Sequence, residues 1–312
     1  MNTSFQQVAV IGAGAMGRGI AQIAAQAGSQ VFLYDTQLEA TEKALTAVHQ
    51  VWDTLASKGR LDTATVAKYK SHLHAAQSLQ DLKPCDLIVE AIVERLDIKK
   101  SLFVELENLV SESTVLVTNT SSLSITAIAA ALQRPSQFAG YHFFNPVPLM
   151  KVVEVIAGLK TNPDVCARLS NFAKQMGHTP VQANDTPGFI VNHAGRGYGT
   201  EALRIVSENV ADFVTIDRIL KDQVGFKLGP FELFDLTALD VSHPVMESIY
   251  NQYYQEPRYR PSVITAQRLA GGVLGKKVGE GFYKYVDGKA VLPIEQAVPE
   301  VKEFPPVWVS PR

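Results

Sequence analysis

Near its start, the chain reads Val8-Ala9-Val10-Ile11-Gly12-Ala13-Gly14-Ala15-Met16-Gly17, an apolar run followed by a glycine-rich turn. The run is apolar on both faces, as in a strand buried inside a parallel sheet. The alanine- and isoleucine-rich segment after the turn predicts a helix that ends at Gly28. In this setting the GxGxxG spacing permits a tight turn, a close approach of the backbone to a pyrophosphate, and close packing of helix on strand. Glycine and alanine also cluster in ordinary tight turns, but the flanking strand and helix favour a dinucleotide site formed by Gly12, Ala13, Gly14, Ala15, Met16 and Gly17.

The next apolar run, residues 31–34, ends at Asp35, which lies 18 residues past Gly17. A carboxylate at the end of the second strand accepts hydrogen bonds from the adenosine ribose and repels a 2′-phosphate, which favours NAD over NADP. The alternative is that Asp35 caps the helix that begins near Gln37.

The same alternation of apolar runs and helical patterns continues through residues 87–89 and 115–117. It predicts βαβ units and a doubly wound, Rossmann-like α/β sheet. Near Asp185 the pattern changes, because a capping residue followed by Pro187 predicts the start of an amphipathic helix, and strand-like runs are scarce beyond it. We therefore expect a dinucleotide-binding domain at 1–185, a mostly helical domain at 186–285, and an extended proline-rich tail or linker at 286–312.

Composition and charge exclude several classes of protein. A chain of 312 residues has room for about two domains, and 46% hydrophobic against 19% charged residues argues against long disorder. A formal net charge of -2 lacks the basic excess of a nucleic-acid-binding protein. Cys85 and Cys166 have no metal-site spacing, so we expect neither a disulfide framework nor a metal site. No apolar run approaches the ~20 residues of a membrane helix, and the first cation is Arg18, which argues against a signal peptide. We expect a soluble, cytoplasmic enzyme or ligand binder.

His142 ends a strand-like stretch, and ligands bind at strand carboxyl ends in this architecture. An imidazole there can take a proton from an alcohol while a hydride leaves the same carbon. Glu154 stands among β-branched residues 12 positions later, and a buried acid needs a partner. A hairpin-like return would bring it to His142, where it would orient the ring. The alternatives are a structural histidine, and a salt bridge from Glu154 to Lys151 or another cation.

Residues 118–122, Thr-Asn-Thr-Ser-Ser, follow another predicted strand. Their hydroxyl and amide groups could meet both a nicotinamide and a substrate oxygen, although Ser122 or Ser124 could instead cap the next helix. Asn192 lies in the first turns of the helix predicted after Pro187, and its amide could donate to a carbonyl oxygen that bears developing charge.

At these residues the chain resembles the short-chain L-3-hydroxyacyl-CoA dehydrogenase family, including bacterial 3-hydroxybutyryl-CoA dehydrogenases. The matching stretches extend from residue 5 to 285, and the most specific are the runs 142–154 and 185–192. The resemblance implies NAD as the cofactor and an acyl-CoA substrate, as in fatty acid β-oxidation. It also implies hydride transfer from C3 of a (3S)-hydroxyacyl-CoA and homodimers through the helical domain, with no nucleic acid or membrane partner.

The resemblance also assigns roles. His142 is similar to the catalytic base, Glu154 to its paired acid, Ser121 to the serine that contacts the substrate oxygen, and Asn192 to the asparagine that helps to hold it. Further positions match residues around the dinucleotide, namely Glu94, Lys99, Asn119, Ser121, Asn145 and Lys277. Lys58 falls near a lysine that contacts coenzyme A, but a family serine one coil earlier on that helix is Val51 here.

Two alternatives stay open. A related two-domain dehydrogenase would act on a free hydroxy acid, and a nucleotide-binding protein without turnover would share only the fold. The tail, which ends Pro305-Pro306-Val307-Trp308-Val309-Ser310-Pro311-Arg312, resembles the connector of longer members with a second helical domain, among them 3-hydroxyadipyl-CoA dehydrogenases of phenylacetate catabolism. If the tail is such a connector, this chain is a piece of a longer protein. The length of the acyl chain is not readable, because one methylene changes binding by only ~1–3 kcal/mol.

Overall fold

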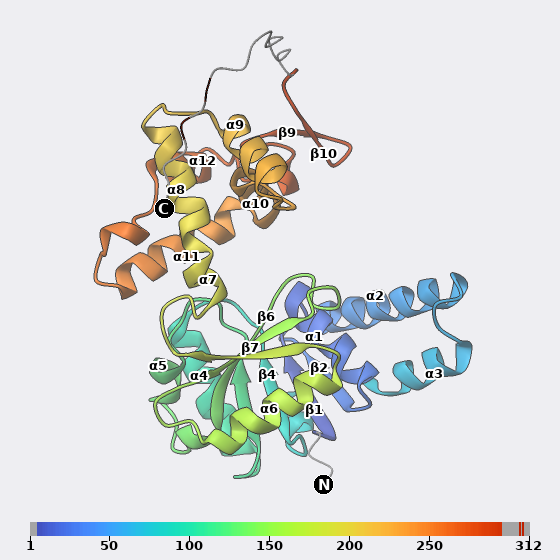
Figure 1. The fold of residues 1–312 in the computed structure, drawn as a ribbon. Coiled ribbons are helices and arrows are strands. Elements are labelled where there is room, and N and C mark those ends of the chain that lie inside the picture. The colour runs from blue at the N-terminus through green and yellow to red at the C-terminus, as the bar shows by residue number, and fades with distance from the viewer. Residues whose placement is uncertain (1–4, 295–305, 307, 309–312) are drawn as a thin grey trace. The chain divides into compact units, whose positions relative to one another are not determined.

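The structure is a computed structural model that describes residues 5–294, 306 and 308. It divides into two units, the first formed by Met1–Thr200 with Pro244–Pro261 and the second by Glu201–His243 with Ser262–Arg312 (Figure 1). The division falls inside two helices, α8 (Arg196–Ser207) and α11 (Leu239–Gln252).

The first unit is built on one eight-stranded sheet, with the strand order β3-β2-β1-β4-β5-β6-β7-β8. All neighbouring strands are parallel except β6 and β7, which are antiparallel. The strands are β1 (Gln7–Ile11), β2 (Gln30–Tyr34), β3 (Leu73–Ala75), β4 (Leu87–Glu90), β5 (Val115–Thr118), β6 (Phe138–Phe143), β7 (Val152–Ala157) and β8 (Thr179–Asn184). The doubly wound α/β sheet predicted from the sequence is confirmed.

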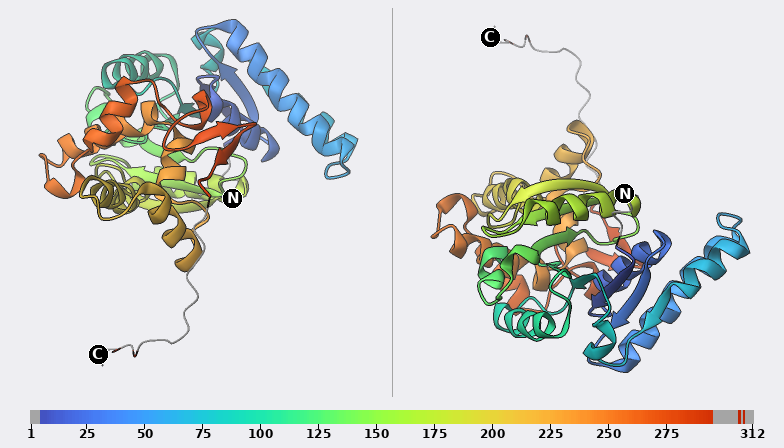
Figure 2. Two further views of the ribbon diagram at one scale, coloured as in Figure 1. Left: turned by 90° about the horizontal axis from the view of Figure 1, so that it is seen from above. Right: turned by 90° about the horizontal axis from the view of Figure 1, so that it is seen from below.

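Helices cover both faces of this sheet, and the apolar run of β1 explains why. Val8 and Val10 pack with α1 (Ala15–Gln26), α2 (Leu38–Ser57) and α6 (Pro163–Gln175), whereas Ala9 and Ile11 pack with α4 (Leu96–Leu109) and α5 (Ile125–Ala129). Because side chains alternate along a strand, both faces must be apolar to be buried. At the β3 edge, α2 and α3 (Thr63–Ser71) lie side by side (Figures 1 and 2). Two short 3-10 turns, η1 (Leu79–Leu82) and η2 (Pro135–Gln137), precede β4 and β6.

The helix predicted to start at Asp185 and Pro187 begins later, as α7 (Val191–Ala194). Gly188 and Phe189 both have positive φ angles, 81° and 51°, which a right-handed helix does not accommodate. The Asp185 carboxylate instead caps α5, because it accepts hydrogen bonds from the backbone N–H groups of Ile125 and Thr126. The prediction that this helix starts at residues 185–187 was therefore wrong.

The second unit is mostly helical and is tied together by two buried carboxylates. Asp217 accepts from the N–H groups at the start of α10, and Asp235 accepts from those of Phe282 and Tyr283. Burial raises the pKa of both aspartates despite these bonds. The elements are α8, α9 (Phe213–Arg218), a π-helical turn η3 (Ile219–Gln223), α10 (Pro230–Thr237), α11, α12 (Val263–Ala270) and η5 (Lys276–Val278); the 3-10 turn η4 (Pro257–Tyr259) lies in the first unit.

The first residues of the tail predicted from residue 286 belong to a β-hairpin. β9 (Lys284–Val286) and β10 (Lys289–Val291) form a two-stranded antiparallel hairpin. Most of the remaining tail, residues 295–305, 307 and 309–312, lies outside the described residues. No helix among the residues that the structure describes has the length and apolar character needed to cross a membrane.

Candidate active site

The glycine-rich turn follows β1 and leads into α1, as the spacing predicts. Gly12 has a φ of +103°, and a Cβ there would lie 2.5 Å from the carbonyl oxygen of Ala91. A Cβ on Gly17 would lie 1.8 Å from the Gly12 oxygen, so the helix could not pack as closely on the turn. Gly14 is the N-cap of α1 and has open space where a side chain would be. The turn therefore fits a pyrophosphate at the N-terminus of a helix.

Asp35 lies beside this turn at the end of β2. Its Oδ2 accepts a hydrogen bond of 2.9 Å from the backbone N–H of Ala13, and its Oδ1 accepts one of 3.0 Å from Gln37. The carboxylate thus connects the glycine-rich turn to the start of α2, and both sequence interpretations remain open. It borders a cleft of about 540 Å³, which is lined by Ile11, Gly12, Tyr34, Asp35, Thr36, Leu79, Ile92, Asp97, Ile98, Ser101, Leu102 and Glu105.

His142 and Glu154 are direct register partners on the antiparallel strands β6 and β7. The His142 Nδ1 lies 2.6 Å from Glu154 Oε2, so the hairpin-like return expected from the sequence brings the two together. The other oxygen, Oε1, accepts hydrogen bonds of 2.9 Å from the N–H groups of Ile190 and Val191. Burial acts to raise the pKa of Glu154, but His142 and these donors outweigh it, so the pKa lies below its usual value.

This charge state decides which way the imidazole proton points. Since Glu154 is a carboxylate, it accepts from His142 Nδ1, and the Nε2 of a neutral ring then carries the free electron pair. Within the described part of the chain, Nε2 has no hydrogen-bond partner. The rings of Phe144 and Phe189 flank the imidazole, with centroids 4.6 Å and 5.8 Å away. The site thus presents one proton acceptor with a defined orientation.

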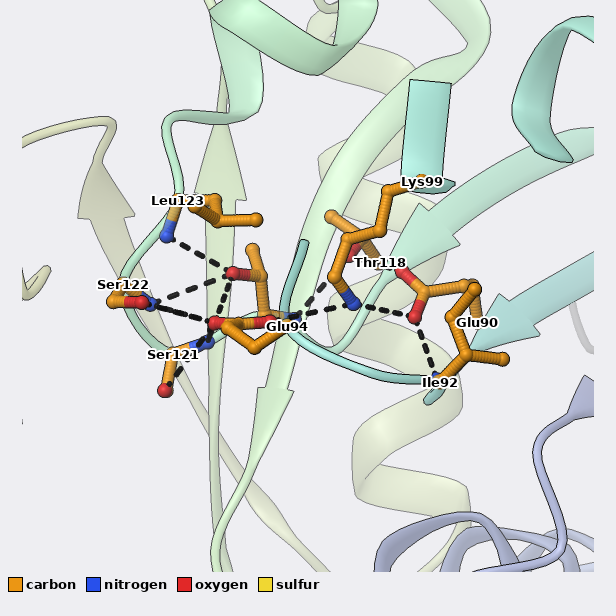
Figure 3. Close-up of polar contacts among 9 residues, drawn as sticks. Glu90, Ile92, Glu94, Lys99, Thr118, Ser121, Ser122 and Leu123 are labelled. Carbon is orange, nitrogen blue, oxygen red and sulfur yellow. Dashed lines mark hydrogen bonds and ion pairs between the residues drawn. The ribbon is translucent and has the colours of Figure 1, made fainter. Parts of the chain in front are cut away.

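Glu94 organises the loop that follows β5 (Figure 3). Its Oε1 accepts hydrogen bonds from the Thr120 hydroxyl at 2.6 Å and from the N–H groups of Ser121 and Ser122 at 2.9 Å and 3.2 Å. Burial acts to raise the pKa of Glu94, but the Lys99 ammonium and these donors lower it overall. The hydroxyl and amide cluster predicted from the sequence is therefore held in one conformation by a charged group.

Lys99 is buried beside this loop, with only 1% of its side chain exposed. Its Nζ lies 2.5 Å from Glu90 Oε1 and 3.3 Å from Glu94 Oε2 (Figure 3). Glu90 is in turn bound by the Thr118 hydroxyl at 2.6 Å and by the Ile92 N–H at 2.7 Å. The ammonium group is enclosed by protein carboxylates, so any contribution of Lys99 to cofactor binding acts through Glu94.

Two asparagines join the loops at the ends of the strands. Asn119 Oδ1 accepts a hydrogen bond of 2.9 Å from the Phe143 N–H, which connects the end of β5 to the residue after His142. The Asn192 amide donates to the backbone oxygen of Ser121 at 3.2 Å. His142, Glu154, Ser121, Asn119 and Asn192 are thus brought together, although they come from four separate segments of sequence.

Two members of this site were not singled out in the sequence. Glu90 gave a signal, because a charged residue at the end of an apolar strand needs a buried partner. Gln252 gave no signal in the sequence, because its partner lies 130 residues away along the chain. Its side-chain amide donates a hydrogen bond of 2.6 Å to the Ser122 backbone oxygen.

Three predicted residues lie elsewhere or make no contact with this group. Asn145 is exposed and precedes a cis peptide bond to Pro146. Lys58 is the exposed C-cap of α2, and its side chain has no ion pair among the described residues. Lys277 belongs to the second unit, where its ammonium group pairs with Asp240. No group of His, Cys, Asp and Glu in the described residues is arranged to hold a metal ion.

Known proteins are similar to this chain over most of its length. Residues 7–186 match the family model for the 3-hydroxyacyl-CoA dehydrogenase NAD binding domain, and residues 188–285 match the C-terminal domain of the same enzymes. A 3-hydroxyadipyl-CoA dehydrogenase of Escherichia coli is 43% identical over 95% of this chain, which spans 62% of that protein's length. A probable 3-hydroxybutyryl-CoA dehydrogenase of Deinococcus radiodurans is 42% identical, over 88% of this chain and 99% of its own. The crystal structure of an E. coli 3-hydroxybutyryl-CoA dehydrogenase aligns with a TM-score of 0.89 and 42% identity, over 95% of this chain and 63% of that one.

Proposed function

The chain belongs to the 3-hydroxyacyl-CoA dehydrogenase family, and on this premise we propose that it interconverts (3S)-3-hydroxyacyl-CoA and 3-oxoacyl-CoA with NAD as the redox partner. The observation that carries the proposal is the His142–Glu154 pair, which leaves one imidazole nitrogen open beside the Ser121 loop. The relatives' names include a four-carbon acyl group and a six-carbon dicarboxylic one, so both are candidate substrates.

The residues of the site have distinct tasks in this reaction. His142 Nε2 takes the proton of the C3 hydroxyl as the C3–H hydride leaves, and Glu154 stabilises the imidazolium that forms. Ser121 and Asn192 orient the C3 oxygen. The glycine-rich turn and Asp35 would hold the pyrophosphate and the adenosine ribose, and NAD, when bound, supplies the hydride acceptor.

The direct test measures the oxidation of NADH by its absorbance, once with acetoacetyl-CoA as substrate and once with free acetoacetate. We expect turnover of the thioester within the usual range of about 1–10³ s⁻¹, and a kcat/KM for the free acid lower by at least about 100-fold, because most of the binding energy comes from the coenzyme A moiety. Equal use of the free acid would instead support a dehydrogenase of free hydroxy acids. NADH binding without consumption of any substrate would support a nucleotide-binding protein without turnover.

Asp35→Asn is expected to weaken the preference for NADH over NADPH by about 100-fold. The substitution keeps an oxygen for the Ala13 and Gln37 N–H groups but removes the charge that would repel a 2′-phosphate. The measurement is the ratio of kcat/KM for the two cofactors, with the exposed Glu39→Gln as the matched charge control on α2. An unchanged ratio would show that the Asp35 carboxylate serves only the start of α2.

We also propose that the protein acts as a homodimer in the cytoplasm, as the family resemblance implies. Sedimentation equilibrium of this chain would then return twice its mass of 34.0 kDa, whereas a single-chain mass would refute the dimer. Fractionation of cells that express the full-length protein, followed by immunodetection, tests the compartment.

A further inference from the structure

Arg196 lies one helical turn beyond Asn192, at the start of α8. Residues four apart in a helix are neighbours on the same face. The Arg196 Nε donates a hydrogen bond of 3.3 Å to the backbone oxygen of Asn192, so its position relative to that residue is defined. The Asn192 amide in turn contacts the Ser121 loop, so Arg196 is bonded to a residue that would hold the substrate oxygen.

The charge of Arg196 has no opposite charge beside it in the part of the chain that the structure describes. The side chain is partly buried, and burial lowers its pKa. Among the described residues, no carboxylate is within ion-pair distance of it, whereas Arg95, Arg134 and Arg204 each pair with an acidic side chain. A guanidinium group has five N–H donors, and within the described part of the chain only the Nε–H of Arg196 has a partner. A partly desolvated cation without a counter-charge is unfavourable, so the arrangement suits an anion supplied by a ligand.

We propose that Arg196 binds a carboxylate at the far end of the acyl chain, so that the preferred substrates are 3-hydroxyacyl-CoA thioesters of dicarboxylic acids. This inference rests on the proposed function, which places C3 of the substrate at His142 and Asn192. The α-helix advances about 5.4 Å per turn, and an extended chain covers about 3.5 Å in three bonds. A carboxylate three bonds beyond C3, as in a six-carbon diacid, therefore comes within reach of a guanidinium one turn beyond Asn192. The planar fork of arginine matches a carboxylate in a bidentate pair.

The phosphates of coenzyme A are the other anions that such a substrate carries. They are common to every acyl-CoA, whereas the terminal carboxylate is present only in dicarboxylic ones. A comparison of two six-carbon thioesters that differ in this group alone therefore separates the two sources.

The experiment measures binding and turnover separately. Titration calorimetry with adipyl-CoA and hexanoyl-CoA, which lack the reacting oxygen, reports binding, and NADH oxidation with 3-oxoadipyl-CoA and 3-oxohexanoyl-CoA reports activity. For the parent we expect the dicarboxylic compound to be favoured by about 10- to 100-fold in both measurements. Arg196→Met should abolish that preference and change the values for the six-carbon monocarboxylic compounds by less than about threefold. Arg196→Lys, which keeps the charge but not the fork, should retain part of the preference.

Arg204→Met is the matched control, because Arg204 lies on the same helix with an exposed side chain paired to Glu208. It should leave the preference unchanged. The inference is overturned if the parent binds both thioesters equally, or if Arg196→Met weakens both by the same factor, which would indicate a coenzyme A phosphate or a structural role. The proposed reaction and the proposed carboxylate site can fail independently. If calorimetry shows a preference for the dicarboxylic thioester but no NADH is oxidised, the proposed reaction is refuted and the carboxylate site is supported.

Discussion

Replacing His142 with glutamine is expected to lower kcat for acetoacetyl-CoA reduction by about a thousandfold, with little change in NADH affinity. Glutamine has a similar size and can still contact Glu154, but it cannot exchange a proton with the substrate oxygen at neutral pH. Because the ring is buried beside Phe144 and Phe189 and does not line the cleft beside Asp35, cofactor binding should be retained. Steady-state kinetics and NADH fluorescence titration measure the two quantities.

Glu154→Gln serves as the second arm of this test. The amide still fits between His142 and the N–H groups of Ile190 and Val191, but it no longer carries the charge that stabilises the imidazolium. We expect a smaller loss, about 100-fold in kcat, because the imidazolium that forms during oxidation is no longer stabilised by a carboxylate. If His142→Gln retains activity within a few-fold of the parent, the assignment of the base is wrong.

Lys99→Met is expected to destabilise the protein by about 3–5 kcal/mol, which corresponds to a fall in Tm of roughly 6–20 °C for a chain of this size. The substitution keeps the length of the side chain but leaves Glu90, which is fully buried, without its cation. Thermal unfolding followed by circular dichroism measures the effect. Lys100→Met, at the next position of α4 and without an ion pair among the described residues, should change Tm only slightly.

A double variant separates the charge from the packing. Glu90→Gln keeps acceptor and donor atoms near Thr118 and Ile92 while it removes the negative charge. Combined with Lys99→Met, it should be more stable than Lys99→Met alone, because no unpaired charge remains buried. A Lys99→Met variant as stable as the parent, or a double variant that shows the simple sum of two losses, would contradict the role of this ion pair.

Much of the architecture could be read before any coordinates, because its signals are local. The buried run of β1, the glycine-rich turn and the start of α1 lie within 20 residues of one another, and their spacing specifies the unit that they form. The pairing of His142 with Glu154 could be proposed as one of two alternatives, because the two strands follow one another in the chain, but their register became known only from the structure.

Other parts depended on contacts that local patterns do not encode. Asp185 reads as the cap of the helix after it, yet the positive φ angles at Gly188 and Phe189 delay that helix, and the carboxylate caps α5 some 60 residues earlier in the chain. Gln252 reaches Ser122 from a helix far along the sequence. A polar side chain shows its chemistry in the sequence, but its partner is chosen by the packing of distant segments.

The residue types and their periods were therefore enough to specify the doubly wound sheet and the dinucleotide turn, since each depends on neighbours in the chain. They singled out His142 by its place at a strand end, while its role as the base that we propose came from the family resemblance. Packing across the fold settled which charges are balanced: it encloses Lys99 between Glu90 and Glu94, and it leaves Arg196 without a carboxylate among the described residues. The reason is physical, because the free energy of a buried charge depends on its desolvation and on the nearest opposite charge, and both are properties of the folded chain.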